Sequence, residues 1–390
     1  MNKIFQHKGD KTIWAVFFIL SAASLLMVYS ASSSLANKLR DGNHLYFLFK
    51  QLSIIVLGYG AMLLFSRIKY SYFQWMSKAL LFLVITILGY TMISGTNINN
   101  ASRWLTIPFT GISFQSSDFA KIVLLTFLAR GISKLSDIYK SNSRPEYWII
   151  ANIFFPAILI SALIVRSNLS TALLIFVSAF YVMWLGKVKI KYLLALVSTG
   201  LLFAVILFFV AKSNPNLMPR FDTWVSRIEN YGGNDTQDGN YQVTQAKIAI
   251  ASNPLFGTLP GKSSQRVFLP SAHSDFIYAI IIEEYGTFVG FFILILYLIL
   301  LYRALQISKK SETKFGALLA MGLIFSIVLQ AFINMGVAVS LLPVTGQPLP
   351  LVSLGGTSFV FTSMALGMVQ SVSVGLKKEK ETTEILEKVQ

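Results

Sequence analysis

The 390-residue sequence contains no cysteine and only three histidines. Without cysteine the protein has no disulfides, no thiolate nucleophile and no cysteine-based metal site. The histidines, His7, His44 and His273, are too widely separated in sequence to suggest a zinc site. Thiol chemistry is therefore excluded, and no zinc motif is present.

Charged residues are also scarce. They make up 13% of the sequence, about half the ~25% of an ordinary soluble domain. Hydrophobic residues make up 54%, and the mean hydropathy is +0.63. The apolar residues occur in blocks of about twenty rather than in heptads or Gly-X-Y triplets, which excludes a soluble globule, a coiled coil and collagen.

Ten apolar blocks are long enough to cross ~30 Å of hydrocarbon as helices. They lie near 12–31, 46–66, 77–95, 117–131, 147–165, 168–186, 191–211, 275–302, 315–339 and 353–375. The first block resembles a signal peptide, but its length and the following spans favour an uncleaved anchor. We therefore expect an all-α integral membrane protein, a single polytopic domain over 1–390 with about ten transmembrane helices.

Basic residues outnumber acidic ones by 33 to 17, for a net charge of +16. Of the 33, 21 lie before residue 12, in 67–78, 130–144, 187–191 and 303–314, and after residue 376. Such an excess marks cytoplasmic segments, so we expect both termini, including the tail 376–390, in the cytoplasm. No basic run is interleaved with aromatics, so we expect no nucleic-acid partner.

The segment 212–274 is the one long loop, and the topology places it outside the cell. Its aromatic residues predict a structured cap, although Gly232–Asn240 is typical of a flexible stretch. The amides of Gln242 and Gln245, next to Tyr241, could orient sugar hydroxyls or could be ordinary loop residues. No internal repeat supports an inverted-repeat transporter.

A polar segment, His273-Ser274-Asp275, leads into the eighth span. We expect Ser274 to be the N-cap and Asp275 to lie in the first turn, where the helix dipole favours an ionised carboxylate that can accept a proton. The alternative is that Asp275 only caps the helix. Glu283 and Glu284 lie about 12 Å deeper; they are either functional or, as we favour, structural partners of a buried lysine.

Two further segments carry candidate residues. Asp118 and Lys121 share a helix face near the outer surface, where a cation could bind lipid phosphates together with Arg103. Alternatively, Arg103 and Trp104 are interfacial anchors and Lys121 snorkels. The uncharged segment 342–358 is rich in proline and glycine, which predicts a rigid extended loop enclosed by protein, since unpaired backbone cannot face lipid.

Together these segments resemble the SEDS family (shape, elongation, division and sporulation), ten-span proteins that polymerise peptidoglycan glycan strands from Lipid II. The resemblance runs over nearly the whole chain, and its motif sequences are closer to those of the division branch than to those of the elongation branch. It is carried by Arg103-Trp104, Gln115–Lys121, Tyr241–Gln245, Leu269–Tyr278, Glu283–Gly286 and Thr345–Ser358.

The resemblance implies a role for each matching residue. The family's catalytic acid corresponds to Asp275, and Asp118, Glu283, Glu284, Pro348, Pro350, Ser353, Gly355 and Gly356 are supporting residues. The substrate-binding candidates are Arg103, Trp104, Gln115, Lys121, Tyr241, Gln242, Gln245, His273 and Ser274. The sequence departs from the family at Ser116 and Asp118, which replace proline and glutamate, and at Arg166 and Asn168, which replace two acids.

The implied function is a peptidoglycan glycosyltransferase at the outer face of the bacterial cytoplasmic membrane, acting at the division septum. Asp275 would take the proton of the acceptor 4-hydroxyl, while Arg103 and Lys121, or a divalent cation such as Mg²⁺ or Mn²⁺, would stabilise the leaving undecaprenyl pyrophosphate. The implied partners are Lipid II, membrane lipid, division proteins and a class B penicillin-binding protein transpeptidase.

Two rival functions are a transporter that uses the same intramembrane charges and a protein without catalytic activity. A lipid-linked precursor flippase would need a polar path through the bilayer, whereas the candidate residues cluster near the outer face. A non-enzymatic division scaffold would tolerate loss of Asp275.

Overall fold

The fold is that of a computed structural model. It describes residues 7–31, 44–94, 96–98, 101–106, 113–141, 144–213, 221, 223–225, 238–252, 255–269 and 272–389.

Helices dominate the described residues. Eight of them are long and apolar enough to cross a membrane, and α5 and α9 complete the ten predicted spans. The spans are α1 (Lys11–Ala31), α3 (His44–Arg67), α4 (Tyr70–Ser94), α5 (Ser116–Ser133), α7–η1–α8 (Pro145–Val165, with the π-helix η1 at Ile150–Phe154), α9 (Leu169–Leu185), α10 (Ile190–Ser213), α14 (Ile277–Lys310), α15 (Lys314–Ala338) and α16 (Gly356–Val389). The predicted all-α membrane fold is confirmed.

A small antiparallel sheet, which the sequence analysis did not predict, interrupts the helices. Its strands β1 (Thr96–Ile98), β2 (Ala101–Thr106) and β3 (Ser113–Gln115) lie in the order β1-β2-β3. They contain β-branched and aromatic residues, but three to six residues are too few to give a clear alternating pattern. The sheet leads directly into α5.

The centre of the bundle is α15. It packs against α5, α9, α14 and α16, and 72% of the residues in its most apolar stretch are buried. In α10, by contrast, only 11% of the residues in the corresponding stretch are buried. A polar side chain on α15 therefore faces protein and has to find its hydrogen-bond partners there.

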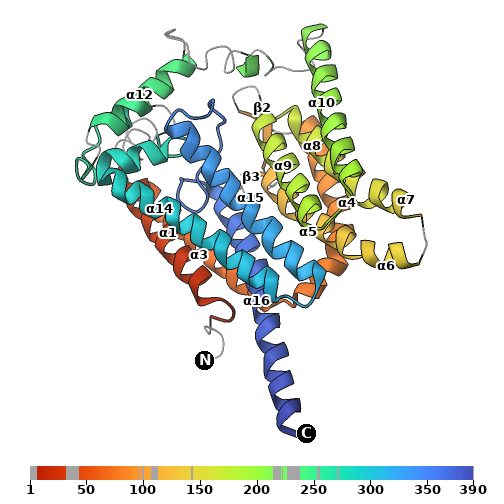
Figure 1. Cartoon of the computed structure of the whole chain (residues 1–390). Coiled ribbons are helices and arrows are strands. Elements are labelled where there is room, and N and C mark those ends of the chain that lie inside the picture. The colour runs from red at the N-terminus through yellow and green to blue at the C-terminus, as the bar shows by residue number, and fades with distance from the viewer. Residues whose placement is uncertain are drawn as a thin grey trace.

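The two ends of the bundle differ in what they carry. The start of α1 and the end of α16 lie at one end, as an even number of spans requires (Figure 1). At the other end lie α12 (Asp238–Ser252), which packs on α14, and the short α13 (Gln265–Phe268). Part of the stretch predicted to be flexible, 232–237, is outside the described residues, but Asp238–Asn240 form the first turn of α12.

A kink divides α14 at Gly286, whose φ of 83° and ψ of 169° are not helical. A Cβ at this position would lie 2.2 Å from the carbonyl oxygen of Leu255. A Cβ on Gly257 would lie 2.4 Å from the carbonyl oxygen of Glu284. The loop after α12 therefore crosses α14 at a distance that only glycine permits on both sides.

Candidate functional site

The turn that carries Asp275 is fixed by its own main chain. Three consecutive carbonyl oxygens accept hydrogen bonds from residues after 333: that of His273 from the Leu354 amide at 2.9 Å, that of Ser274 from the Ser353 hydroxyl at 2.7 Å, and that of Asp275 from Asn334 Nδ2 at 2.8 Å. These bonds fix the backbone of the turn, and with it the direction of the Asp275 Cα–Cβ bond, through residues distant in sequence.

The expected helix cap is wrong. The helix α14 begins at Ile277, its N-cap is Phe276, and no side chain caps it. Asp275 precedes the helix, and its Oδ1 accepts a 3.0 Å hydrogen bond from the Ser274 hydroxyl. The N-cap therefore lies two residues after Ser274, and Asp275 is not in the first turn of α14.

Gly346, in the loop 341–355, lies beside the Asp275 carboxylate. Its φ is 65°, and a Cβ there would lie 3.5 Å from Asp275 Oδ2. A side chain at this position would be strained and would also occupy the space beside the carboxylate. The glycine thus keeps the loop 341–355 close to Asp275.

The loop 341–355 is extended and held by the bundle, as its composition predicts. The carbonyl of Pro348 accepts a hydrogen bond from Gln330 Nε2 at 3.0 Å, and that of Pro350 accepts one from the Tyr297 hydroxyl. Ser353 Oγ also accepts from the Leu349 amide at 2.8 Å. Gly355 and Gly356 follow, where the loop turns into α16. Backbone groups that cannot face lipid are thereby paired within the protein.

Lys121 is joined to the same loop. Its ammonium, on α5, donates a 2.7 Å hydrogen bond to Gln330 Oε1, and the Gln330 amide in turn holds Pro348. One turn further along α15, Asn334 Nδ2 bonds both the Gln347 carbonyl, at 2.8 Å, and the Asp275 carbonyl. Hydrogen bonds through α15 and the loop therefore connect Lys121 to the Asp275 turn.

Asp118 lies one helical turn from Lys121 and is 7% exposed. The two do not form an ion pair, since the described residues contain only the pairs Lys191–Glu146 and Arg303–Asp10. Asp118 instead hydrogen-bonds Ser358 at the start of α16, and its Oδ2 is buried without a partner. A small cavity lies between the two charged residues, with α15 and α16 forming its other walls.

Asn168, at a position where the resemblance implies an acid, caps a helix. It is the N-cap of α9, and its Oδ1 accepts a hydrogen bond from the Thr171 amide at 3.3 Å. Asparagine caps a helix about as well as aspartate. The Thr171 hydroxyl accepts from Gln347 Nε2 at 2.8 Å, so α9 also holds the loop beside Asp275.

Trp104 and Gln115 are opposite each other across β2 and β3. The backbone N–H of Gln115 also donates a 3.4 Å hydrogen bond to the Thr357 hydroxyl, near the start of α16. The sheet thus lies beside the end of the loop 341–355. The backbone of Arg103 is in β2, but its side chain is outside the described part of the structure.

In the described part of the chain, Glu283 and Glu284 do not have the lysine partner that was expected, and instead accept hydrogen bonds from a loop and from α1. The carboxylate of Glu283 accepts hydrogen bonds from the amides of Ser264, at 3.0 Å, and Gln265, at 3.2 Å, and from the Ser263 hydroxyl. Glu284 accepts from the Ser263 amide at 3.3 Å and from the Ser30 hydroxyl. Neither glutamate has a lysine partner among the described residues, and both hold the loop before α13 onto α14.

The α12 residues stay apart from this centre. Gln242 and Gln245 share a helix face with the buried Ala246 and Ala249, whereas Tyr241 is 40% exposed. In the described region, no hydrogen bond joins the two glutamines to the Asp275 turn. Burial lowers the pKa of His273, which favours its neutral imidazole.

The described residues bring together no group of three or more histidine, aspartate or glutamate side chains that could hold a metal ion. The predicted divalent cation therefore has no such ligand cluster in this region.

Gln330, Asn334 and Tyr297 were missed by the sequence analysis, although they hold the site. A signal for the first two was present. Gln330 and Asn334 are four residues apart in an otherwise apolar span and are therefore on one helix face. Polar residues inside a span face the bundle interior. For Tyr297 no such spacing exists, because a lone tyrosine in an apolar block is ordinary.

The chain is similar to known proteins over nearly its whole length. The family model FtsW/RodA/SpoVE, described as cell cycle protein, matches residues 10–378. The chain is 31% identical to the probable peptidoglycan glycosyltransferase FtsW of Geobacter metallireducens, covering 94% of this chain and 95% of that one. It is 32% identical to the protein of the same name from Thioalkalivibrio sulfidiphilus, covering 94% and 88%.

Solved structures have the same fold. A chain from a structure described as the coordination of polymerization and crosslinking by a peptidoglycan synthase complex matches with a TM-score of 0.72 at 24% identity, covering 95% of this chain and 99% of that one. The rod shape determining protein RodA of Thermus thermophilus matches with a TM-score of 0.64 at 22% identity, covering 94% and 96%.

Proposed function

The chain belongs to the FtsW/RodA/SpoVE family of cell cycle proteins, and from this premise we propose that it is a peptidoglycan glycosyltransferase that polymerises Lipid II during cell division. The names of its relatives support the reaction and the division role. Asp275 is the general base, and Lys121 and Arg103 stabilise the leaving pyrophosphate.

One observation carries the proposal. Three consecutive carbonyls of His273–Asp275 are held by α15 and the loop 341–355, so the base is positioned before substrate arrives. A general base has to lie within hydrogen-bond reach of its proton, and rates fall steeply when a catalytic group is displaced by an ångström.

The proposed reaction is a displacement at the anomeric carbon of the donor. The Asp275 carboxylate takes the proton of the acceptor 4-hydroxyl, and the hydroxyl oxygen forms the new bond to that carbon. The bond from the carbon to the pyrophosphate oxygen breaks, and the electron pair leaves with undecaprenyl pyrophosphate. The cation of Lys121 acts on this developing charge, and the hydrogen bond to Gln330 holds it in place.

We propose that both termini are cytoplasmic and that α12 and the Asp275 turn are on the outer face, where Lipid II is polymerised. The basic loops support this orientation. Because the chain has no cysteine, a single cysteine can report it. A cysteine at Thr244 on α12 should react with an impermeant maleimide from outside, and one at Lys309 only after permeabilisation. The reverse pattern would overturn the orientation.

We also propose a class B penicillin-binding protein as partner, which would supply transpeptidation. One structural relative comes from a peptidoglycan synthase complex that coordinates polymerization and crosslinking, and this likeness supports such an assembly. Binding near α12 would favour the active arrangement of the outer end, so polymerisation should rise in the complex.

The deciding experiment is a Lipid II polymerisation assay with the purified full chain, alone and with the co-purified transpeptidase. We expect glycan strands from the complex and fewer from the chain alone. No polymer under either condition, together with transport of Lipid II by the same protein in liposomes, would replace the glycosyltransferase with the flippase.

A further inference from the structure

A second polar cavity lies at the end of the bundle that carries the two termini, away from the Asp275 turn. Its volume is about 470 Å³, within the range of small-ligand sites. Its walls come from the start of α1, the end of α14 and the middle of α16. Three helices therefore meet around a space at this end of the bundle.

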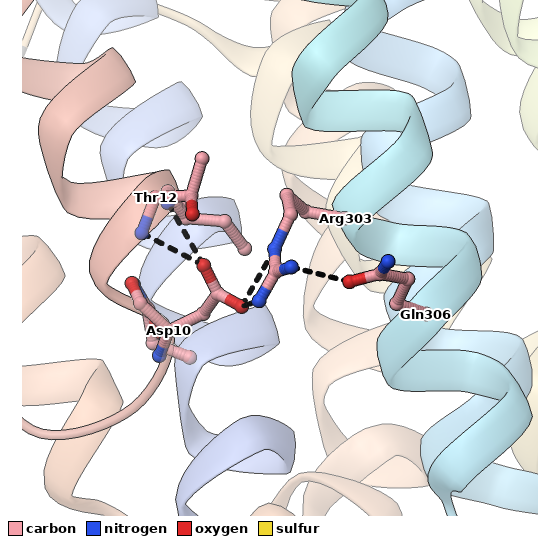
Figure 2. A network of polar contacts seen from close by, with 6 residues as sticks. Asp10, Thr12, Arg303 and Gln306 are labelled. Carbon is pink, nitrogen blue, oxygen red and sulfur yellow. Dashed lines mark hydrogen bonds and ion pairs between the residues drawn. The ribbon is translucent and has the colours of Figure 1, made fainter.

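Among the described side chains that line the cavity, Asp10 is the only acidic one, and both its oxygens accept hydrogen bonds. Its Oδ1 accepts from the amides of Thr12, at 2.9 Å, and Ile13, at 3.2 Å, and so caps α1. Its Oδ2 accepts from Arg303 Nε at 2.9 Å and also from Nη2 (Figure 2). The remaining Arg303 nitrogen, Nη1, donates to Gln306. Asp10 and Arg303 thus neutralise each other.

The wall that carries Asp10 is also rigid. The Asp10 amide donates to Gln370 Oε1 at 2.7 Å, and Gln370 Nε2 donates back to the Asp10 carbonyl at 2.8 Å. Gly9 has a φ of 99°, and a Cβ there would lie 2.3 Å from Gln370 Oε1. The cavity is therefore built by specific contacts between α1 and α16.

Two lysines in the lining, Lys11 and Lys310, leave a net positive charge. Neither has an ion pair among the described side chains. Ile307 and Leu376 add apolar wall beside them. A phosphate group fits the cationic part, and the apolar part favours a phosphate that carries a hydrocarbon chain over a free ion.

We propose that this cavity binds the phosphate head group of an anionic membrane phospholipid. The site joins α1, α14 and α16, and it lies at the C-terminal end of α14, whereas Asp275 precedes the N-terminal end of that helix. It does not depend on the glycosyltransferase proposal, because its chemistry is set by the two lysines and the apolar wall alone.

The test compares two double variants that remove the same charge. Lys11→Gln/Lys310→Gln removes the two lysines of the cavity. The control, Lys8→Gln/Lys309→Gln, removes two exposed neighbours on the same segments that do not line it. Binding of short-chain phosphatidylglycerol, phosphatidylcholine and inorganic phosphate to the delipidated full chain is measured by native mass spectrometry and thermal shift.

We expect wild type and control to bind phosphatidylglycerol at least tenfold more tightly than phosphatidylcholine. The cavity variant should bind it about tenfold to thirtyfold more weakly than wild type, from the usual contribution of a lysine at an anionic surface. Lys11→Arg/Lys310→Arg should bind as wild type does, which shows that charge rather than folding is responsible.

Three results would overturn the proposal. Equal losses in both glutamine variants would show a diffuse surface effect. Unchanged binding in Lys11→Gln/Lys310→Gln would show that the lipid lies elsewhere. Displacement of phosphatidylglycerol by inorganic phosphate at similar concentrations would assign the cavity to a soluble anion.

Discussion

Asp10 and Asp275 both precede a transmembrane helix, but the protein holds them in opposite ways. Asp10 is held by its side chain, whose two oxygens cap α1 and pair with Arg303. Asp275 is held by its main chain and its two predecessors, through carbonyls that accept from Asn334, Ser353 and the Leu354 amide. Both carboxylate oxygens of Asp10 hold the start of α1, so we expect Asp10 to have a structural role. The three backbone anchors of the Asp275 turn do not involve its carboxylate, so they should survive replacement of that carboxylate by an amide.

The difference between the two aspartates is tested most directly by replacing each carboxylate with its amide. Asp275→Asn keeps the size and all three backbone anchors, but it cannot take a proton at neutral pH. We expect polymerisation to fall by about 10²–10⁴-fold, the usual contribution of positioned proton transfer, with normal folded yield. The measurement is Lipid II polymerisation per folded molecule in the complex with the transpeptidase.

Asp10→Asn is the matched control, because asparagine still caps α1 while the ion pair is lost. It should reduce the yield or thermal stability and leave turnover per folded molecule close to wild type. Wild-type polymerisation by Asp275→Asn would refute the base, which would then be sought at Asp118, Glu283 or Glu284.

The next effect concerns the leaving group. Lys121→Ala should reduce turnover by about 10²–10³-fold, as removal of a single preorganised donor does elsewhere, and Arg103→Ala should also reduce it. Folded yield should change less, because Lys121 is bound to one glutamine rather than to an acid. If both variants lose yield and turnover together, the interfacial-anchor interpretation is correct.

The third effect is on stability alone. Asp10→Ala removes the cap of α1 and leaves Arg303 without its carboxylate, so the free energy of unfolding should fall by about 1–3 kcal/mol. Thermal unfolding of the purified protein measures it. A Ser274→Ala variant, which keeps the Ser274 backbone anchor, should change stability by less; a larger loss than in Asp10→Ala would contradict the division between the two ends.

The apolar helices and their order follow from the sequence because hydrocarbon thickness dictates block length. Eight of the ten predicted spans are long and apolar enough to cross a membrane, and α5 and α9 lie at the other two. The position of Asp275 relative to its helix was wrong by two residues, since Ser-Asp before an apolar run suggests a cap whether or not one forms. Asp10 was not singled out, although Gly9-Asp10 before the first apolar block has the same pattern and does form a cap.

The anchoring of the site could not be read from the sequence. Asn334, Ser353 and Asp275 come from three separate segments, and their contacts depend on how α14, α15 and the loop 341–355 pack. Even the glutamate pair, correctly placed in the membrane helix, was assigned the wrong kind of partner. Serine hydroxyls and backbone amides of a distant loop satisfy Glu283, and those groups carry no charge pattern that a sequence displays.

The smallest expected effect is the contribution of His273, in the Asp275 turn, to the pH dependence of stability. Burial lowers the pKa of His273, so the folded protein keeps the neutral imidazole when the unfolded chain already binds a proton. Stability should therefore be unaffected by His273 above its ordinary pKa of about 6.5, and it should fall as the pH drops below that value. His273→Gln removes this contribution.

Thermal unfolding at pH 7.5 and pH 5.5 should then show a smaller acid destabilisation in His273→Gln than in wild type. The difference cannot exceed the limit of about 1.4 kcal/mol per pH unit for one proton. If the two proteins lose the same stability on acidification, the imidazole is accessible to protons in the folded state. The turn that carries Asp275 would then be accessible to water in the folded protein.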